Sequence, residues 1–267
     1  MRTLYYFIAL LAFTSCEDVI DLPLEEGPKR LVIDANINWE KGTLGNEQVI
    51  RLTETVGFYE QDIPVVSNAI VTISDSSKDY VFVEDGTTGI YRTTSFEPQI
   101  DETYTLTIEY NGETFNATES LKSVTDITSV EQSFQNIFGE EVIRVDFNYT
   151  DPADEENYYV SVFSSDAYLL NFTRTWSDEF IDGNDDSVFE IDENFEPGNT
   201  LTLRFFGVSE QYHNYTELLL QQIESGGPFA TPPAAVKGNC INLTNPDSKP
   251  LGYFRLSEVV TTPYVIQ

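Results

Sequence analysis

The stretch TYTLTIEYNGETFNATES, residues 103–120, decides the fold class of this chain. Apolar and polar residues alternate on both sides of the Asn111-Gly112 pair, which is the period of a strand with one buried face. A two-residue turn of type I′ needs positive φ at both central positions, and Asn-Gly adopts these angles at low cost. The stretch therefore predicts an antiparallel hairpin whose turn lies at residues 111 and 112.

The same alternation recurs on either side of this hairpin. In LVIDANIN, residues 31–38, every second residue is apolar, which predicts another strand with one buried face. Further strand signals follow at short intervals without a helical pattern between them, as is typical of an antiparallel sandwich. The segments VSNAIVTI, GIY and TYTLTIEYNGE resemble carboxypeptidase-regulatory-like and related immunoglobulin-like modules. We predict such a β-sandwich over residues 29–122.

Residues 123–267 predict a second β-rich domain, because the strand pattern starts again after residue 122. One helix is expected near residues 210–225, where an apolar stripe with helical spacing precedes two glycines and a proline. The stripe consists of Tyr212, Tyr215, Leu218, Leu219 and Ile223. It packs on the second sheet or, alternatively, binds a partner. The predicted fold is all-β: two tandem antiparallel immunoglobulin-like β-sandwich domains, the second with one short helix and long loops, the longest over residues 226–250.

The N-terminus has the pattern of an export signal that stops at a cysteine. Arg2 precedes the apolar run LYYFIALLAF, residues 4–13, which as a helix would span about 15 Å, half of a hydrocarbon core. Cys16 stands at the expected cleavage site and resembles the lipobox of bacterial lipoproteins. We expect residues 1–15 to be a signal peptide, Cys16 to carry the lipid, and the acidic residues 16–28 to form a tether. An ordinary secretory signal and an unprocessed N-terminus are the alternatives.

The charge of the chain excludes several classes of partner. It holds 45 Asp and Glu against 14 Lys and Arg, for a net charge of −31. Such a surface repels phosphate backbones, and no run of Lys or Arg occurs in the sequence, so we expect no nucleic-acid partner. Anionic lipid headgroups are disfavoured for the same reason. The acidity indicates solubility at an exposed surface or, alternatively, binding of a divalent cation.

The residues that common enzyme mechanisms require are scarce. His213 is the only histidine, so the sequence offers no catalytic zinc set and no motif for a Ser-His-Asp triad. We expect the protein not to be an enzyme, and His213 to cap a helix or lie at the surface. Cys240 is the second of 2 cysteines. If Cys16 is acylated, Cys240 has no disulfide partner, and we expect a buried, inert thiol.

One acidic segment has the spacing of a calcium-binding loop. Asp182, Asn184, Asp186 and Glu193 occupy positions 1, 3, 5 and 12 of such a loop. Ser187 stands at position 6, where glycine usually makes the turn, so a solvated acidic hairpin is the alternative. The tripeptide of residues 186–188 also resembles a short O-glycosylation motif of Bacteroidota surface proteins. Calcium is the one cofactor that the sequence suggests.

Three segments together resemble one family. They are CEDVIDLPL at residues 16–24, LVIDANIN followed by VSNAIVTISD, and PPAAVKGNCINLTNP leading into LGYFRLSEV. The family consists of Bacteroidota outer-membrane lipoproteins that carry a domain of unknown function and are encoded beside TonB-dependent receptors. The resemblance implies a lipid-anchored outer-membrane protein facing the cell exterior, an accessory or ligand-capture subunit of a TonB-dependent nutrient transporter. The alternative is a stand-alone cell-surface binding or adhesion module for a glycan, a peptide or calcium.

Overall fold

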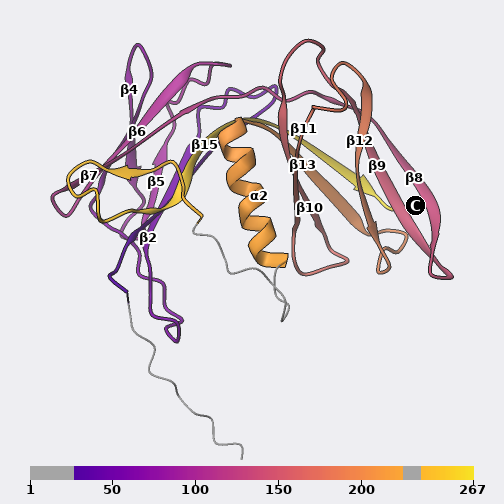
Figure 1. Ribbon diagram of the computed structural model, residues 1–267, viewed down its shortest axis with the longest axis horizontal. Helices are drawn as coiled ribbons and strands as arrows, with labels where there is room; N and C mark the ends of the chain where they lie inside the picture. Colours follow the sequence, from indigo (N-terminus) through magenta and orange to yellow (C-terminus); the bar gives the residue numbers. More distant parts are fainter. Residues whose placement is uncertain (1–26, 225–235) are drawn as a thin grey trace, which may run out of the picture.

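The computed structural model describes residues 27–224 and 236–267, and nearly all of its regular structure is β (Figure 1). A 12-stranded sheet has the order β11-β10-β13-β15-β1-β2-β5-β4-β3-β6-β7-β14, and a 3-stranded sheet has the order β12-β9-β8. The strands of the first half and of the returning chain are β1 (Leu31–Glu40), β2 (Gln48–Glu54), β3 (Ile70–Ser74), β4 (Asp79–Glu84), β5 (Ile90–Thr93), β6 (Thr103–Tyr110), β7 (Glu113–Ser120), β14 (Ile241–Asn242) and β15 (Leu251–Val265). Those of the second half are β8 (Ile127–Ile137), β9 (Glu140–Thr150), β10 (Tyr158–Ser165), β11 (Phe172–Ser177), β12 (Asp185–Asp192) and β13 (Thr200–Val208).

The hairpin predicted at residues 103–120 is confirmed. Strands β6 and β7 pair antiparallel along their whole length, and Asn111 and Gly112 have φ angles of 51° and 78°. The inward residues of the hairpin, among them Leu106 and Phe115, lie in a hydrophobic core shared with β1 to β5. Local alternation and the turn pair therefore set the face and the register of this part of the sheet.

A second hydrophobic core lies between the small sheet and the strands β10 and β13. Nearly half of its buried side chains are aromatic, including Phe147 of β9, Phe163 of β10 and Phe205 of β13. The small sheet supplies one wall of this core, and the large sheet supplies the other. We refer to the parts of the molecule around the two cores as the first and second halves.

Strand β15 joins the two halves, and the sheets are therefore not divided into two separate sandwiches as predicted. Its first part pairs in parallel with β1, and its last part pairs antiparallel with β13. Residues 253–259 are all buried, as expected for a strand covered on both faces. Phe254 and Leu256 belong to the first core, whereas Val260 and Tyr264 pack against the second. What is confirmed is a mostly β fold, with one helix among residues 27–224 and 236–267.

Two glycines allow the close approach of β1, β15 and the segment before β14. Gly252 has a φ of 93°, and a Cβ there would lie 1.9 Å from the carbonyl oxygen of Ile33. A Cβ on Gly238 would lie 1.7 Å from the carbonyl oxygen of Gly252. The described part of the predicted long loop, residues 236–250, thus crosses β15 and reaches β7, with which β14 pairs.

The helix predicted near residues 210–225 is confirmed as α2 (Glu210–Glu224), which lies on the concave side of the arch of strands in Figure 1. The rings of Tyr212 and Tyr215 pack against Tyr253, with centroids 4.9 and 4.7 Å away. Leu218 and Ile223 are exposed. Only the first part of the predicted stripe therefore packs on the sheet. Within residues 27–224 and 236–267, no helix has the length and apolar character that a membrane crossing requires.

Candidate functional site

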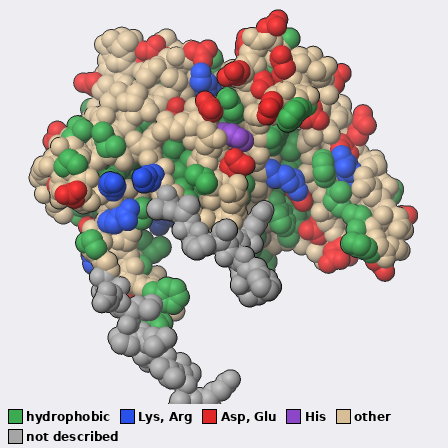
Figure 2. All heavy atoms as spheres, viewed as in Figure 1, with side chains coloured by type: hydrophobic (Ala, Val, Ile, Leu, Met, Phe, Trp, Pro, Cys, Tyr) green, Lys and Arg blue, Asp and Glu red, His purple; other side chains and the backbone are tan. Residues whose placement is uncertain are grey.

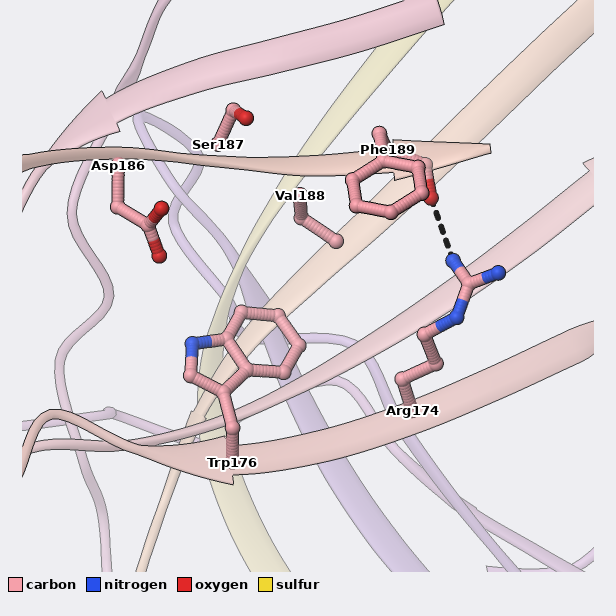
Figure 3. Close-up of a pocket in the computed structure, with 6 residues that line it drawn as sticks. All are labelled: Arg174, Trp176, Asp186, Ser187, Val188 and Phe189. Atoms are coloured by element: carbon pink, nitrogen blue, oxygen red, sulfur yellow. Dashed lines mark hydrogen bonds between the residues drawn. The ribbon is translucent and has the colours of Figure 1, made fainter. Parts of the chain in front are cut away.

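A cavity of about 220 Å³ lies where β11 and β12, edge strands of the two sheets, face each other (Figure 3). It is lined by Arg174, Trp176, Asp186, Ser187, Val188 and Phe189. In Figure 3 the side chain of Val188 points toward the Trp176 ring, and Arg174 and Asp186 lie on opposite sides of the cavity. The lining therefore has an apolar middle and polar groups at either side.

Contacts with the second core fix the orientation of the Trp176 ring. Its indole stacks on Phe205, with centroids 5.7 Å apart and an interplanar angle of 14°. Its Nε1 donates a hydrogen bond to the hydroxyl of Tyr149 at 3.0 Å, and that hydroxyl donates to Asp186 Oδ2 at 3.2 Å. Burial raises the pKa of Tyr149 above its ordinary value, so its hydroxyl stays protonated at neutral pH. The cavity thus has a preformed aromatic wall.

The positive charge of the cavity is compensated. Arg174 Nη1 lies 3.0 Å from Glu190 Oε2, and the same atom donates a hydrogen bond to the carbonyl oxygen of Phe189 (Figure 3). Glu190 is buried, and burial raises its carboxyl pKa, although the nearby Arg174 opposes this shift. Because the guanidinium already has an anionic partner, the cavity suits a neutral ligand better than an anion.

Three carboxylates gather where β9 ends and the segment leading into β12 begins. Oxygen atoms of Asp151, Asp178 and Asp182 lie within 4.8 Å of one another. Burial raises the pKa of Asp151, although its Oδ1 accepts a hydrogen bond from the Tyr159 hydroxyl at 2.6 Å. Like charges at this distance favour protonation of one member or a cation among them. Three oxygens are fewer than the six to eight that Ca²⁺ takes, so the trio alone does not complete a calcium site.

The four residues predicted as a calcium loop do not converge in the structure. Asp186 lies in β12 and Glu193 follows the far end of that strand, so about seven extended residues, or about 23 Å, separate them. Asn184 is exposed, and its Nδ2 donates to the backbone of Asp182. Of the four, Asp182 alone belongs to the carboxylate trio. The spacing fits a curved loop, whereas this segment is mostly a paired strand.

The two cysteines have different outcomes. Cys16 lies outside the described residues, so its lipidation stays a prediction. Cys240 is buried, and burial raises its thiol pKa to about 12, as expected of an inert thiol.

His213 is neither a helix cap nor fully exposed. Its Nδ1 lies 2.7 Å from Thr175 Oγ1, and its ring lies 5.4 Å from that of Tyr158. Burial lowers the pKa of its imidazole. Ser209, whose Oγ accepts a hydrogen bond from the Tyr212 backbone N–H at 3.1 Å, caps α2 instead. His213 thus helps to hold α2 against β10 and β11.

The end of the second half opposite the carboxylate trio exposes large apolar side chains. Strand pairing brings the β8–β9 turn, the β10–β11 loop and the β12–β13 loop to this end. The exposed residues at or near these connections are Phe134, Ile137, Phe138, Leu169, Leu170 and Phe172, which we call the apolar end. Phe138 and Leu169 have relative exposures of 103% and 102%. Sequence reasoning missed this surface because its members come from two separate segments without a shared period.

Over the part of the chain that the structure describes, fold and surfaces define a mostly β protein with one helix and several candidate contact sites. Residues 17–262 match the family described as Domain of unknown function (DUF4249), and the chain belongs to this family. None of the curated proteins matches the chain. Among solved structures, a two fibronectin type-III domain segment from chicken tenascin is 14% identical, with a TM-score of 0.20, over 61% of this chain and 85% of that chain. At this TM-score the likeness does not define the fold.

Proposed function

We propose that this protein is a surface-exposed outer-membrane lipoprotein that acts as an accessory or ligand-capture subunit of a TonB-dependent nutrient transporter. The cysteine at the end of the short export signal supports the lipid anchor, and the family match begins at the next residue, 17. The resemblance to lipoproteins encoded beside TonB-dependent receptors supports the partner. The apolar end is the structural observation that carries the proposal.

The apolar end has the properties of a docking surface. A gathering of large exposed apolar side chains at one end of a molecule typically marks a contact with another protein. Burying a side chain such as Phe138, Leu169 or Leu170 contributes about 2 kcal/mol each. Their positions at the tips of two connections leave them free to enter pockets of a partner without disturbing the core.

Affinity purification of the lipidated chain from outer membranes tests this proposal. We expect the wild type to recover a β-barrel receptor, and the triple variant Phe138→Ser, Leu169→Ser, Leu170→Ser to lose at least tenfold of it. The matched control changes three equally exposed apolar residues elsewhere to serine: Leu44, Phe58 and Phe180. Recovery of no receptor by the wild type, or equal loss in both variants, would contradict the proposal.

We also infer that the two halves correspond to two sandwich-like units that share β15. The two separate hydrophobic cores support this, because each collects the inward residues of its own set of strands. In this arrangement β15 supplies a strand to both units. Urea unfolding followed by the fluorescence of Trp39 alone and of Trp176 alone tests this inference.

A second candidate function is a stand-alone surface module that binds a saccharide, and the cavity beside Trp176 favours it. A sugar ring has a flat apolar face and a rim of hydroxyl groups. The ring of Trp176 offers a matching flat wall, and Asp186 and Arg174 offer an acceptor and a donor at the sides. The compensated charge of the cavity agrees with a neutral ligand.

Tryptophan fluorescence reports directly on this cavity. Trp39 and Trp176 are the 2 tryptophans of the chain, so Trp39→Phe leaves Trp176 as the only indole. We expect a saturable change in its emission with at least one member of a panel of neutral oligosaccharides. Calorimetry on Trp176→Ala should show at least a tenfold loss of affinity, whereas Trp39→Phe should bind normally. A flat response across the panel would oppose this function.

A further inference from the structure

Lys and Arg are scarce in this chain, and most of those in the described ranges have partners. Carboxylates form ion pairs with Lys41, Lys78, Arg92, Lys122, Arg144 and Arg174. The guanidinium groups of Arg204 and Arg255 lie over the ring of Phe206. Apart from Arg204 and Arg255, the cations without a carboxylate within 4.0 Å among residues 27–224 and 236–267 are Lys29, Arg30, Arg51, Lys237 and Lys249, which we call the basic patch.

Three of these residues meet where β1 and β15 begin. Arg30 Nε donates a hydrogen bond to the backbone oxygen of Lys249 at 2.8 Å, which joins the start of β1 to the segment before β15. Lys29 precedes Arg30 in the chain. The side chains of Lys29 and Lys249 are exposed. This corner of the sheet therefore presents three cations to solvent or to a partner.

The other two residues lie beside this corner. Lys237 precedes Gly238, whose backbone packs on β15 at Gly252. Arg51 of β2 stands opposite Asp34 of β1, so both side chains lie on the same face of the sheet. Figure 2 shows Lys and Arg side chains gathered on this face of the first half, near the start of the described chain. Four separate segments contribute to the patch, and no run of basic residues in the sequence indicates it.

The net charge of −31 does not describe the field at this face. At physiological salt the Debye length is about 8 Å, so acids on distant parts of the surface are largely screened at contact. A Lys or Arg close to an anionic membrane surface contributes about 1 kcal/mol of attraction. Asp34, beside Arg51, and the exposed Asp247, two residues before Lys249, oppose this attraction, but five cations outnumber these two acids.

We propose that the basic patch binds the phosphate groups of a lipid surface and orients the protein on its membrane. This inference rests on the proposed lipid anchor at Cys16. Residues 16–28 reach at most about 43 Å when fully extended, and the next residue is Lys29, the first member of the patch. The five cations are spread over several segments instead of focused into a cavity, which suits a surface of many phosphates rather than one small anion.

Vesicle co-sedimentation tests the proposal on the mature chain, residues 16–267, with Cys16→Ser to remove the acylation site. We expect binding to phosphatidylglycerol vesicles, no binding to phosphatidylcholine vesicles, and a steep loss of binding as salt rises. The variant Lys29→Glu, Lys249→Glu should bind at least tenfold more weakly. The control Lys78→Glu, Lys122→Glu has the same net charge and changes exposed cations elsewhere, so it should bind like the parent chain.

Three outcomes would overturn the proposal: equal binding to both lipids, no binding to either, or equal loss in both variants. A fourth outcome is binding that appears only after the acids within residues 17–26 are neutralised. It would mean that the basic patch binds those acids instead of lipid phosphates, and it would also overturn the proposal. Mass spectrometry of the native protein tests the anchor separately. An acylated Cys16 without vesicle binding would contradict only the basic patch, whereas an unmodified Cys16 would contradict the proposed function.

Discussion

The two halves of the molecule bury different kinds of side chains. The first core is mostly aliphatic along its strands. Its Glu119 is buried at the border with α2, where it accepts a hydrogen bond from Ser209 at 2.9 Å, and burial raises its carboxyl pKa. The second core is richer in aromatic rings, several of which surround Phe205. Asp151 and Glu190 are buried beside these rings, and burial raises both carboxyl pKa values.

This difference separates a scaffold from a region suited to binding. Burying a carboxylate destabilises a fold unless partners compensate the charge, so such groups concentrate at functional sites more often than chance would place them. In the second half they flank the cavity and the carboxylate trio. The first half has a conventional core, and its distinctive feature is the basic patch on its surface.

The largest expected effect comes from removing a central ring. Phe205→Ala should destabilise the protein by about 3–5 kcal/mol, and Leu106→Ala in the first core by about 2–5 kcal/mol. Because β15 contributes to both cores, we expect one cooperative transition in each variant. Urea unfolding followed by fluorescence of Trp39 alone and of Trp176 alone measures both halves. Two separated midpoints would show that the halves unfold independently.

The second expected effect is an opposite response to acid of two carboxylates, Glu190 in the second half and Asp75 in the first. A raised carboxyl pKa means that the folded state holds the proton more tightly, so the contribution of Glu190 to stability rises as the pH falls through its raised pKa toward about 4.3. Asp75 behaves differently: although slight burial opposes ionisation, hydrogen bonds from Tyr80, Ser77 and Lys78 lower its pKa. The stability that Asp75 provides is present above about pH 3.9 and is lost below it.

Melting temperatures between pH 7 and pH 3 measure this contrast. From pH 7 to about 4.5 the wild type should gain stability relative to Glu190→Gln, which cannot titrate at this position. Below about pH 3.9 the wild type should lose stability relative to Asp75→Asn. Parallel pH profiles for the wild type and Glu190→Gln would contradict the raised pKa of the Glu190 carboxyl group.

The smallest expected effects concern two tight turns with a glycine of positive φ, one in each half. Gly112→Ala in the first half and Gly139→Ala in the β8–β9 turn of the second should each cost about 1–2 kcal/mol, because both glycines have positive φ. Asn111→Gly should change stability by less than about 0.5 kcal/mol. Thermal melts compare the three variants. A tolerated Gly112→Ala would show that packing, and not the turn, sets the register of β6 and β7.

Local features of the fold could be predicted from the sequence, whereas features assembled from distant segments could not. The Asn111-Gly112 turn and α2 depend on neighbouring residues, so their patterns indicate them. The parallel pairing of β1 with β15 joins Ile33 to Gly252, and no local pattern records such a partner.

The candidate sites follow the same division. The four residues with calcium-loop spacing do not come together, because residues 185–192 form a paired strand instead of a loop. The cavity needs Trp176 from one sheet edge and Phe189 from the other. The basic patch is missed by any search for basic runs because its members are dispersed along the chain. In each case tertiary proximity, and not spacing along the chain, creates the chemistry.

The position of β15 near the end of the chain also determines when the fold can be completed during synthesis. Residues 31–40 cannot acquire their parallel neighbour until residues 251–259 have been made. The contacts of Phe254 and Leu256 in the first core form equally late, and Ile266 reaches the second core later still. The two cores of this protein are therefore completed only when almost its whole length has been translated. For the exported lipoprotein that we propose, such late completion of the fold suits passage through a narrow secretion channel, which requires an unfolded polypeptide.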